Sequence, residues 1–224
     1  MEILEHLPVS LATEEIRKWL HVKNEDQWQE IEPLAQWAAS ITGKAVYKAS
    51  CIEAKAGDSI VIDGISLTSK VLRKNVDKLE TVFPYVVTIG DSVEEKAQSL
   101  DVLGQYYLTT IGNKAVSSAR DRLIEHVRTR FASGDLGYMS PGSLRDWPIE
   151  EQVPLFSILG DVESSIGVRL TESLVMQPRM SVSGILFPTD SSFVNCRLCP
   201  RKQCPSRRAR FDEALAREYG IEIQ

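Results

Sequence analysis

The chain has 224 residues, and 43% of them are hydrophobic, which is enough to bury a substantial core and argues against disorder. Its formal net charge of −5 makes nucleic-acid binding unlikely as its main role, because a phosphate footprint needs a clearly basic face. No apolar run approaches the roughly 20 residues that a transmembrane helix needs, and the N-terminal stretch MEILEHLPVS lacks the pattern of a secretory signal. We therefore expect a cytoplasmic protein without a membrane partner.

Residues 1–43 are predicted to form an N-terminal helical segment. Thr13 is a good N-cap, and two acidic residues follow it in the first helical turn. From residue 26 to residue 42, apolar side chains recur at spacings of three and four, and Gly43 supplies a C-terminal stop.

Residues 44–194 are predicted to form an α+β core. Short stretches rich in β-branched residues and bounded by glycines indicate strands. These stretches are 45–54, 59–64, 65–69, 81–90, 168–176 and 180–188. A long helix is predicted over 105–132 and a shorter one over 148–160. Because strands and helices do not alternate regularly, we expect a mixed or antiparallel sheet packed with helices, including one long helix.

Arginines are frequent on the predicted long helix. Its apolar stripe includes Leu108, Ala115 and Leu123, which would face the core. We expect the arginines to lie mostly on its solvent-facing side: Arg120, Arg122, Arg128 and Arg130.

The segment 132–153 is dense in Gly, Pro and Ser and is predicted to be a long ordered loop. Loops of this length inside a domain are usually functional. The stretch GYMSPGSL within it can fix a tight turn that exposes backbone groups to a small polar ligand. The alternative is an ordinary crossover loop.

Residues 195–224 are predicted to form a cysteine-rich basic tail and a C-terminal helix. Cys196, Cys199 and Cys204 have Cys-x2-Cys-x4-Cys spacing, which is typical of metal ligands, and Cys51 is the candidate for a fourth ligand. We predict either zinc or an iron–sulfur cluster and leave the choice between them open. Redox-active thiols and incidental cysteines are the alternatives.

From about residue 84 to residue 193, the chain resembles the activation domain of vitamin B12-dependent methionine synthase. The similarity lies in the stretch PYVVTIG, the long helix ending in HVR, the loop SPG, and LTES followed by M.P..SVSG. The resemblance implies an α+β domain that binds S-adenosylmethionine and presents it to a corrinoid whose cobalt has been oxidised, for reductive remethylation. The cysteine tail has no counterpart in the family pattern.

The resemblance also implies a ligand site. Its predicted residues are Tyr138, Ser140, Pro141, Gly142, Ser143, Glu172 and Phe193. The loop 140–142 matches the family's small-residue ligand loop, and Phe193 matches an aromatic contact. Three positions depart from the pattern: Tyr138 replaces an arginine that grips the methionine carboxylate, Ser143 replaces an aromatic residue, and Ser117 replaces a glutamate.

The predicted function is that of an accessory protein in corrinoid methyl transfer. It would dock on a cobalamin-binding protein or a methionine synthase core, meet cobalamin only through that partner, and use a redox donor, with S-adenosylmethionine as its own ligand. The sequence does not decide whether the chain is an enzyme; if it is, the resemblance implies a part in a methyltransferase system. The alternative is a non-catalytic binding module with a structural zinc in the tail.

Overall fold

The computed structural model describes residues 1–132, 134–189, 193–204 and 207–221. The strands are β1 (Glu2–Pro8), β2 (Thr42–Tyr47), β3 (Ser50–Ala56), β4 (Ser59–Ile62), β5 (Ile65–Thr68), β6 (Thr81–Thr88), β7 (Leu136–Met139), β8 (Arg169–Leu170), β9 (Met176–Gln177) and β10 (Ser181–Pro188). The α-helices are α1 (Thr13–Trp19), α2 (Glu25–Ala39), α3 (Lys70–Asn75), α4 (Ser92–Ala97), α5 (Val102–Phe131), α6 (Gln152–Leu159), α7 (Val162–Ile166) and α8 (Glu213–Glu218). Two short 3-10 helices are η1 (Ile149–Glu151) and η2 (Asn195–Leu198).

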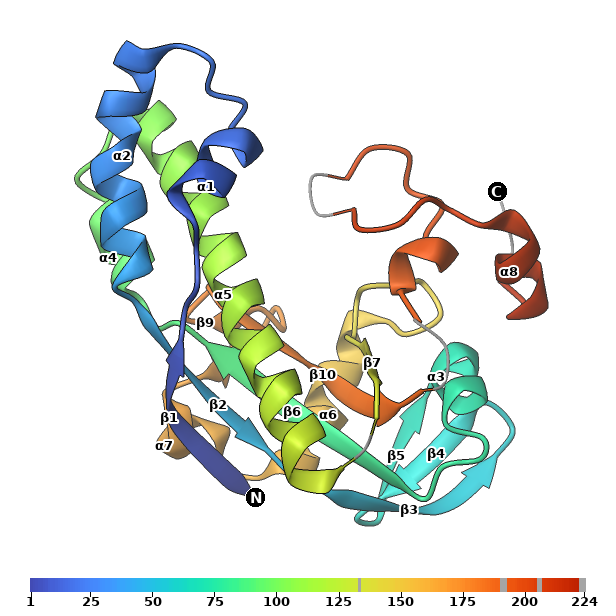
Figure 1. The fold of residues 1–224 in the computed structure, drawn as a ribbon. Coiled ribbons are helices and arrows are strands. Elements are labelled where there is room, and N and C mark those ends of the chain that lie inside the picture. The colour runs from blue at the N-terminus through green and yellow to red at the C-terminus, as the bar shows by residue number, and fades with distance from the viewer. Residues whose placement is uncertain (133, 190–192, 205–206, 222–224) are drawn as a thin grey trace.

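An antiparallel sheet organises the molecule (Figure 1). Its main path runs β1-β2-β6-β3-β4-β5, and β10 pairs with both β6 and β7. Every pairing between the described strands is antiparallel. The predicted α+β fold with an antiparallel sheet and one long helix is therefore confirmed.

Helix α5 covers one face of the sheet. Asp101 caps its N-terminus by accepting a hydrogen bond from the Gly104 N–H at 2.8 Å. The predicted apolar stripe is buried along the helix, where Leu108 and Leu123 pack in one cluster with Tyr85 and other strand residues. Figure 1 shows α5 lying across β6 and β10. This stripe, rather than helix propensity alone, holds the 30-residue helix against the sheet.

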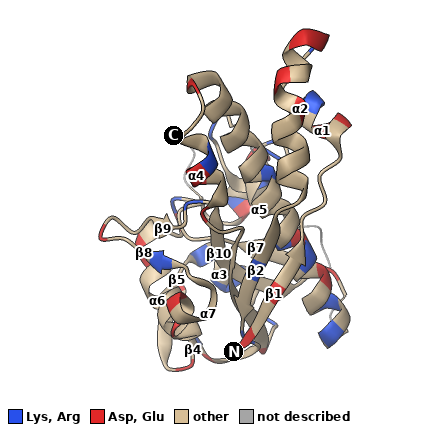
Figure 2. Cartoon of the chain, turned by 90° about the vertical axis from the view of Figure 1, so that its left-hand side faces the viewer, with Lys and Arg blue, Asp and Glu red and all other residues tan. Residues whose placement is uncertain are grey.

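Helices α6 and α7 cover the other face of the sheet (Figure 2). Val86 packs with Leu159 and Val162 of these helices, whereas its neighbour Val87 packs in the α5 cluster. Successive side chains of a strand point to opposite faces, so this alternation separates the two helical layers. A third cluster joins α3, β10 and the tail through Val71, Phe187 and Leu198. Among the described residues, no helix has the length and apolar character that a membrane crossing requires.

Some elements differ from the sequence-based prediction. The N-terminal segment contains strand β1 before α1 and α2, because β1 is an edge strand held by pairing with β2 and buries only Leu7. The short helices α3 and α4 were not predicted, since six residues carry little periodicity. The predicted strand 168–176 is a short hairpin of β8 and β9 around a turn, and the predicted C-terminal helix is confined to α8.

Candidate functional site

The predicted ligand loop begins at the end of β7 and closes on itself. The Gly142 N–H donates to the Trp147 carbonyl oxygen at 2.7 Å, and the Ser143 N–H donates to the Ser140 carbonyl oxygen at 3.1 Å. The Trp147 side chain is fully buried and anchors the loop in the core. Gly142 has a φ of +77°, a conformation that favours glycine. These interactions give the loop a defined shape at the surface.

Gly184 lets this loop start directly against the sheet. In the register of β10, Gly184 lies opposite Tyr85 of β6, and Ile185 lies opposite Met139 of β7. A Cβ at Gly184 would lie 2.2 Å from the Met139 carbonyl oxygen and 3.0 Å from Ser140 Oγ. Only a residue without a side chain allows this approach. The glycine of the SVSG stretch is therefore a packing requirement of the loop.

Two arginines lie over the ring of Tyr138. The guanidinium carbon of Arg120, on α5, is 4.3 Å from the ring centroid, and that of Arg208, in the tail, is 4.6 Å from it. The Arg120 side chain is only 11% exposed, so the prediction of a solvent-facing arginine is wrong at this position. Arg120 directly follows the buried Ala119 on α5, and its guanidinium packs on the Tyr138 ring instead of extending into solvent.

Burial dominates the ionisation of this cluster. Burial raises the pKa of Tyr85 to about 12, and the nearby positive charge of Arg120 opposes that increase. Burial also raises the pKa of Tyr138, against the opposing charges of Arg120 and Arg208. Burial disfavours the charged form of Arg120, but Tyr85, Tyr138 and Asp121 together hold the pKa of its guanidinium above the ordinary value. Both tyrosines are therefore neutral hydrogen-bond donors beside charged guanidinium groups at neutral pH.

Other predicted ligand residues lie on the loop itself and in a cluster of aromatic rings. Pro141 is buried, whereas Gly142 and Ser143 are exposed on the loop. The Ser143 hydroxyl accepts a hydrogen bond from Asn195 Nδ2 at 3.0 Å, which ties the loop to the tail. Phe193 packs between two other aromatic rings, at 5.7 Å from Phe187 and 6.1 Å from Tyr219 between centroids.

The LTES stretch forms the turn between β8 and β9. Glu172 is exposed there, and Leu174 has a φ of +61°. The buried Gln152 holds this turn, because its Nε2 donates to the Leu174 carbonyl oxygen at 2.8 Å. The Ser183 hydroxyl of β10 donates to Gln152 Oε1 at 3.0 Å. The two most specific stretches of the resemblance, LTES and SVSG, are thus joined through one glutamine.

The four cysteines do not gather into one site. Cys51 is exposed on β3, while Cys196, Cys199 and Cys204 are half-buried in the tail. Within the described residues, no three His, Cys, Asp or Glu side chains are placed to hold a metal ion. The arrangement therefore does not support the predicted zinc site or iron–sulfur cluster.

Arg207 instead holds the backbone around the tail cysteines through hydrogen bonds. The Arg207 guanidinium donates to the carbonyl oxygens of Cys196 at 3.2 Å and Cys199 at 3.3 Å, and to that of Arg201. The backbone N–H of Arg208 approaches Cys196 Sγ at 3.5 Å. The basic residues of the tail therefore fold its backbone around a guanidinium and bring Arg208 over Tyr138.

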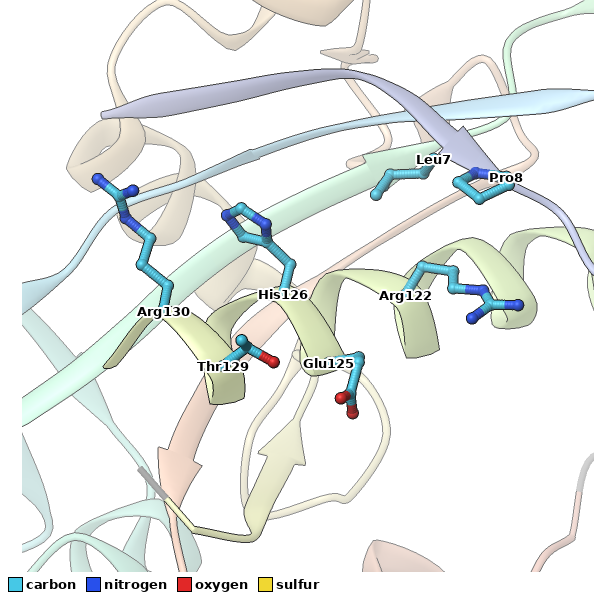
Figure 3. A pocket seen from close by; sticks show the side chains of 7 residues that line it. All are labelled: Leu7, Pro8, Arg122, Glu125, His126, Thr129 and Arg130. Carbon is cyan, nitrogen blue, oxygen red and sulfur yellow. The ribbon is translucent and has the colours of Figure 1, made fainter. Parts of the chain in front are cut away.

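A separate shallow hollow lies between β1 and α5 (Figure 3). Its volume is about 530 Å³, and it is lined by Leu7, Pro8, Arg122, Glu125, His126, Thr129 and Arg130. His126 Nε2 lies 3.0 Å from the Tyr47 hydroxyl, which donates to Glu2 Oε2 at 3.0 Å. None of the predicted ligand residues lines this hollow.

Sequence reasoning missed Tyr85, Arg120 and Arg208 as site residues. Each belongs to an element that has an ordinary structural interpretation: an apolar strand, a charged helix and a basic tail. The signal that could have identified Arg120 is its place directly after Ala119, at the edge of the apolar stripe.

Comparisons with known proteins agree with this architecture. The family model described as vitamin B12 dependent methionine synthase, activation domain, matches residues 138–210. A solved structure described as the MetH reactivation domain bound to AdoHcy is 18% identical, with a TM-score of 0.55, and the match covers 98% of this chain and 88% of that one. No curated protein matches the chain.

The family match extends through the three tail cysteines to residue 210, so the expectation that the tail has no counterpart in the family is wrong. The matched segment also contains the ligand loop, the β8–β9 turn and the SVSG strand. The predicted resemblance is confirmed: this chain has the fold of the methionine synthase reactivation domain, and its residues 138–210 match the activation-domain family of vitamin B12-dependent methionine synthase.

Proposed function

We propose that this protein supports the reductive remethylation of a corrinoid protein and binds S-adenosylmethionine at the loop 138–143. The observation that carries the proposal is the family match over 138–210, the segment that contains this loop. The similar solved structure is a reactivation domain bound to AdoHcy, and the match covers 98% of the present chain. S-adenosylmethionine would supply an electrophilic methyl group to the reduced cobalt of the partner.

The residues around the loop fit a polar ligand. Gly142 and Ser143 are exposed, and the loop is held by backbone hydrogen bonds, so its shape exists before a ligand arrives. Tyr85 and Tyr138 each have a buried hydroxyl without a hydrogen-bond partner among the described residues. Buried polar groups are normally satisfied, so such hydroxyls favour a bound group that completes them.

Cobalamin would reach this site only on a partner protein. Three large apolar side chains on η1, α6 and the β8–β9 turn are exposed, namely Ile149 at 40%, Val153 at 48% and Val175 at 50%. A Cβ at Gly142 would lie 3.0 Å from Ile149 Cδ1, which places Ile149 next to the ligand loop. A surface of this kind fits the docking of a corrinoid domain. The electron for cobalt would come from a separate redox donor.

The alternative, a binding module with a structural zinc, has no observation in its favour within the described parts of the chain, because three metal-ligating side chains do not gather there.

The proposal is tested by a spectroscopic reactivation assay. A corrinoid protein in the cob(II)alamin state is mixed with a reductant and S-adenosylmethionine, with and without this chain, and methylcobalamin formation is followed by its visible spectrum. We expect the chain to accelerate that conversion. Equal rates with and without the chain would contradict the proposal.

A matched pair of variants locates the activity. Gly142 and Gly57 both have positive φ values, +77° and +55°, but only Gly142 lies in the ligand loop. Gly142→Val should abolish the acceleration, and Gly57→Val, in the turn between β3 and β4, should retain it. Equal activities of the two folded variants would place the activity elsewhere.

A further inference from the structure

The cluster around Tyr138 brings together two positive charges that come from distant parts of the sequence. Arg120 is on α5 and Arg208 is in the tail, yet both guanidinium carbons lie within 4.6 Å of the centroid of the same ring. The Arg120 side chain is 11% exposed, whereas Arg208 is exposed. One guanidinium is thus largely removed from water, whereas the other is exposed.

These two charges are poorly compensated. Arg120 donates to Asp121 Oδ1 through Nε at 3.3 Å and Nη2 at 2.9 Å, and Asp121 is itself 65% exposed. The Arg208 guanidinium contacts the Tyr138 ring and has no carboxylate partner within the described chain. Its neighbour Arg207, in contrast, donates to four backbone carbonyl oxygens. A largely buried cation beside a second cation is unfavourable unless an anion joins them.

Two buried hydroxyls complete the cluster. Tyr85 is fully buried, and neither its hydroxyl nor that of Tyr138 has a hydrogen-bond partner among the described residues. The Ser140 hydroxyl lies close enough to lower the pKa of Tyr85, but it does not complete a hydrogen bond of good geometry. Both arginines act electrostatically on both tyrosines, so the four groups share one neighbourhood. Two unsatisfied hydroxyl donors beside two guanidinium groups, of which only Arg120 has a carboxylate partner, have the composition of an anion site.

We propose that Arg120, Arg208 and the hydroxyls of Tyr85 and Tyr138 form a binding site for an oxyanion. This inference rests on the proposed function in one respect: the oxyanion is assigned as the carboxylate of the S-adenosylmethionine amino-acid group. Guanidinium groups pair with carboxylates through parallel N–H donors, and the tyrosine hydroxyls would donate the remaining hydrogen bonds. The tail would thereby supply the arginine that the sequence lacks at position 138, and Arg208 would be a specificity-determining residue.

Calorimetric titration of the full chain tests this site with three probes: S-adenosylhomocysteine, adenosine and inorganic phosphate. Arg208→Gln removes the exposed charge, and Arg210→Gln is the matched control because Arg210 is an exposed arginine of the same tail. For S-adenosylhomocysteine we expect the Kd of Arg208→Gln to rise roughly ten- to a hundredfold, with Arg210→Gln unchanged. Adenosine, which lacks the carboxylate, should bind equally to all three proteins.

The outcomes separate this inference from the proposed function. Binding of S-adenosylhomocysteine that is unaffected by Arg208→Gln would overturn the anion site and leave the proposed function standing. If the wild type bound phosphate but neither S-adenosylhomocysteine nor adenosine, and Arg208→Gln abolished phosphate binding, the anion site would be supported. Its assignment to the carboxylate of S-adenosylmethionine would then be wrong. If the wild type bound none of the three probes, the site would be disproved. Tyr138→Phe keeps the ring and deletes only the hydroxyl. It should weaken the binding of S-adenosylhomocysteine without affecting the binding of adenosine.

Discussion

The backbone of Met139 lies so close to Gly184 that no side chain fits between them: a Cβ at Gly184 would be 2.2 Å from the Met139 carbonyl oxygen. Because that oxygen belongs to the backbone, it cannot turn away as a flexible side chain could. The contact fixes where β7 pairs with β10 and therefore where the ligand loop begins. Strand pairing and site geometry depend on the same residue.

Gly184→Ala should destabilise the protein markedly. Overpacking a well-packed position costs about 1–3 kcal/mol, and we expect a value at or above the upper end, because backbone must move. Chemical denaturation measures the loss. Gly57→Asn is the control, since Gly57 has open space around it and asparagine tolerates its φ of +55°. A loss in Gly184→Ala no larger than that of the control would show that β7 does not need this glycine.

Ser183→Ala should free the β8–β9 turn from the core. The Ser183 hydroxyl donates to Gln152 Oε1, and both residues are 2% exposed. The substitution therefore leaves the buried Gln152 Oε1 without this donor, at a cost of about 1–3 kcal/mol. Gln152 also holds the Leu174 carbonyl oxygen, so we expect faster proteolysis between 171 and 175. Ser157→Ala, at an exposed serine of α6, is the control. Unchanged cleavage in Ser183→Ala would contradict the coupling.

Asp146 connects the ligand loop to the start of α3. Its carboxylate accepts hydrogen bonds from the Lys70 N–H at 3.1 Å, the Val71 N–H at 3.0 Å and the Ser69 hydroxyl. Asp146→Ala should cost about 1–2 kcal/mol, the range of a lost helix cap, and should increase hydrogen exchange both in α3 and in the loop. Exchange that rises in α3 alone would show that the loop does not depend on this contact.

The tail should loosen in acid before the core does. The Leu215 N–H and the Arg197 guanidinium, which donate to Asp212 at 3.0 and 2.7 Å, hold the pKa of its carboxyl below the ordinary value. A carboxyl with a lowered pKa stabilises the fold when it is ionised. Its contribution is complete above the ordinary carboxyl pKa of about 4 and is lost as the pH falls through the lowered value.

Limited proteolysis across this pH range checks the expectation. Cleavage within 195–221 should increase as the pH falls below roughly 4, while β6 and α5 remain protected. Asp212→Asn should show the increased cleavage already at neutral pH and little further change in acid. A wild-type tail that stays protected in acid until the whole chain unfolds would contradict this prediction.

The elements that could be predicted from the sequence are those with strong internal periodicity. The stripe through Leu108 and Leu123 defined α5, and the apolar run of β6 defined the centre of the sheet. Edge strand β1 could not be predicted, because pairing with β2 rather than its own pattern makes it a strand.

The site was only partly predictable for a related reason. The ligand loop was visible through its glycines, prolines and serines, but Arg120, Arg208 and Tyr85 meet only through tertiary contacts. The cysteine spacing predicted a metal site, and the structure instead folds the tail around Arg207. Cysteine spacing shows which thiols can approach one another. It does not show whether the backbone carbonyl oxygens around them will bind an arginine guanidinium instead.

The most direct test of the central claim is transfer of an isotopically labelled methyl group from S-adenosylmethionine to the cobalt of a cob(II)alamin-loaded corrinoid protein under reducing conditions. We predict labelled methylcobalamin when this chain is present, and little when it is absent or replaced by Gly142→Val. Equal label on cobalt in all three reactions, or none in any, would contradict a role in corrinoid reactivation.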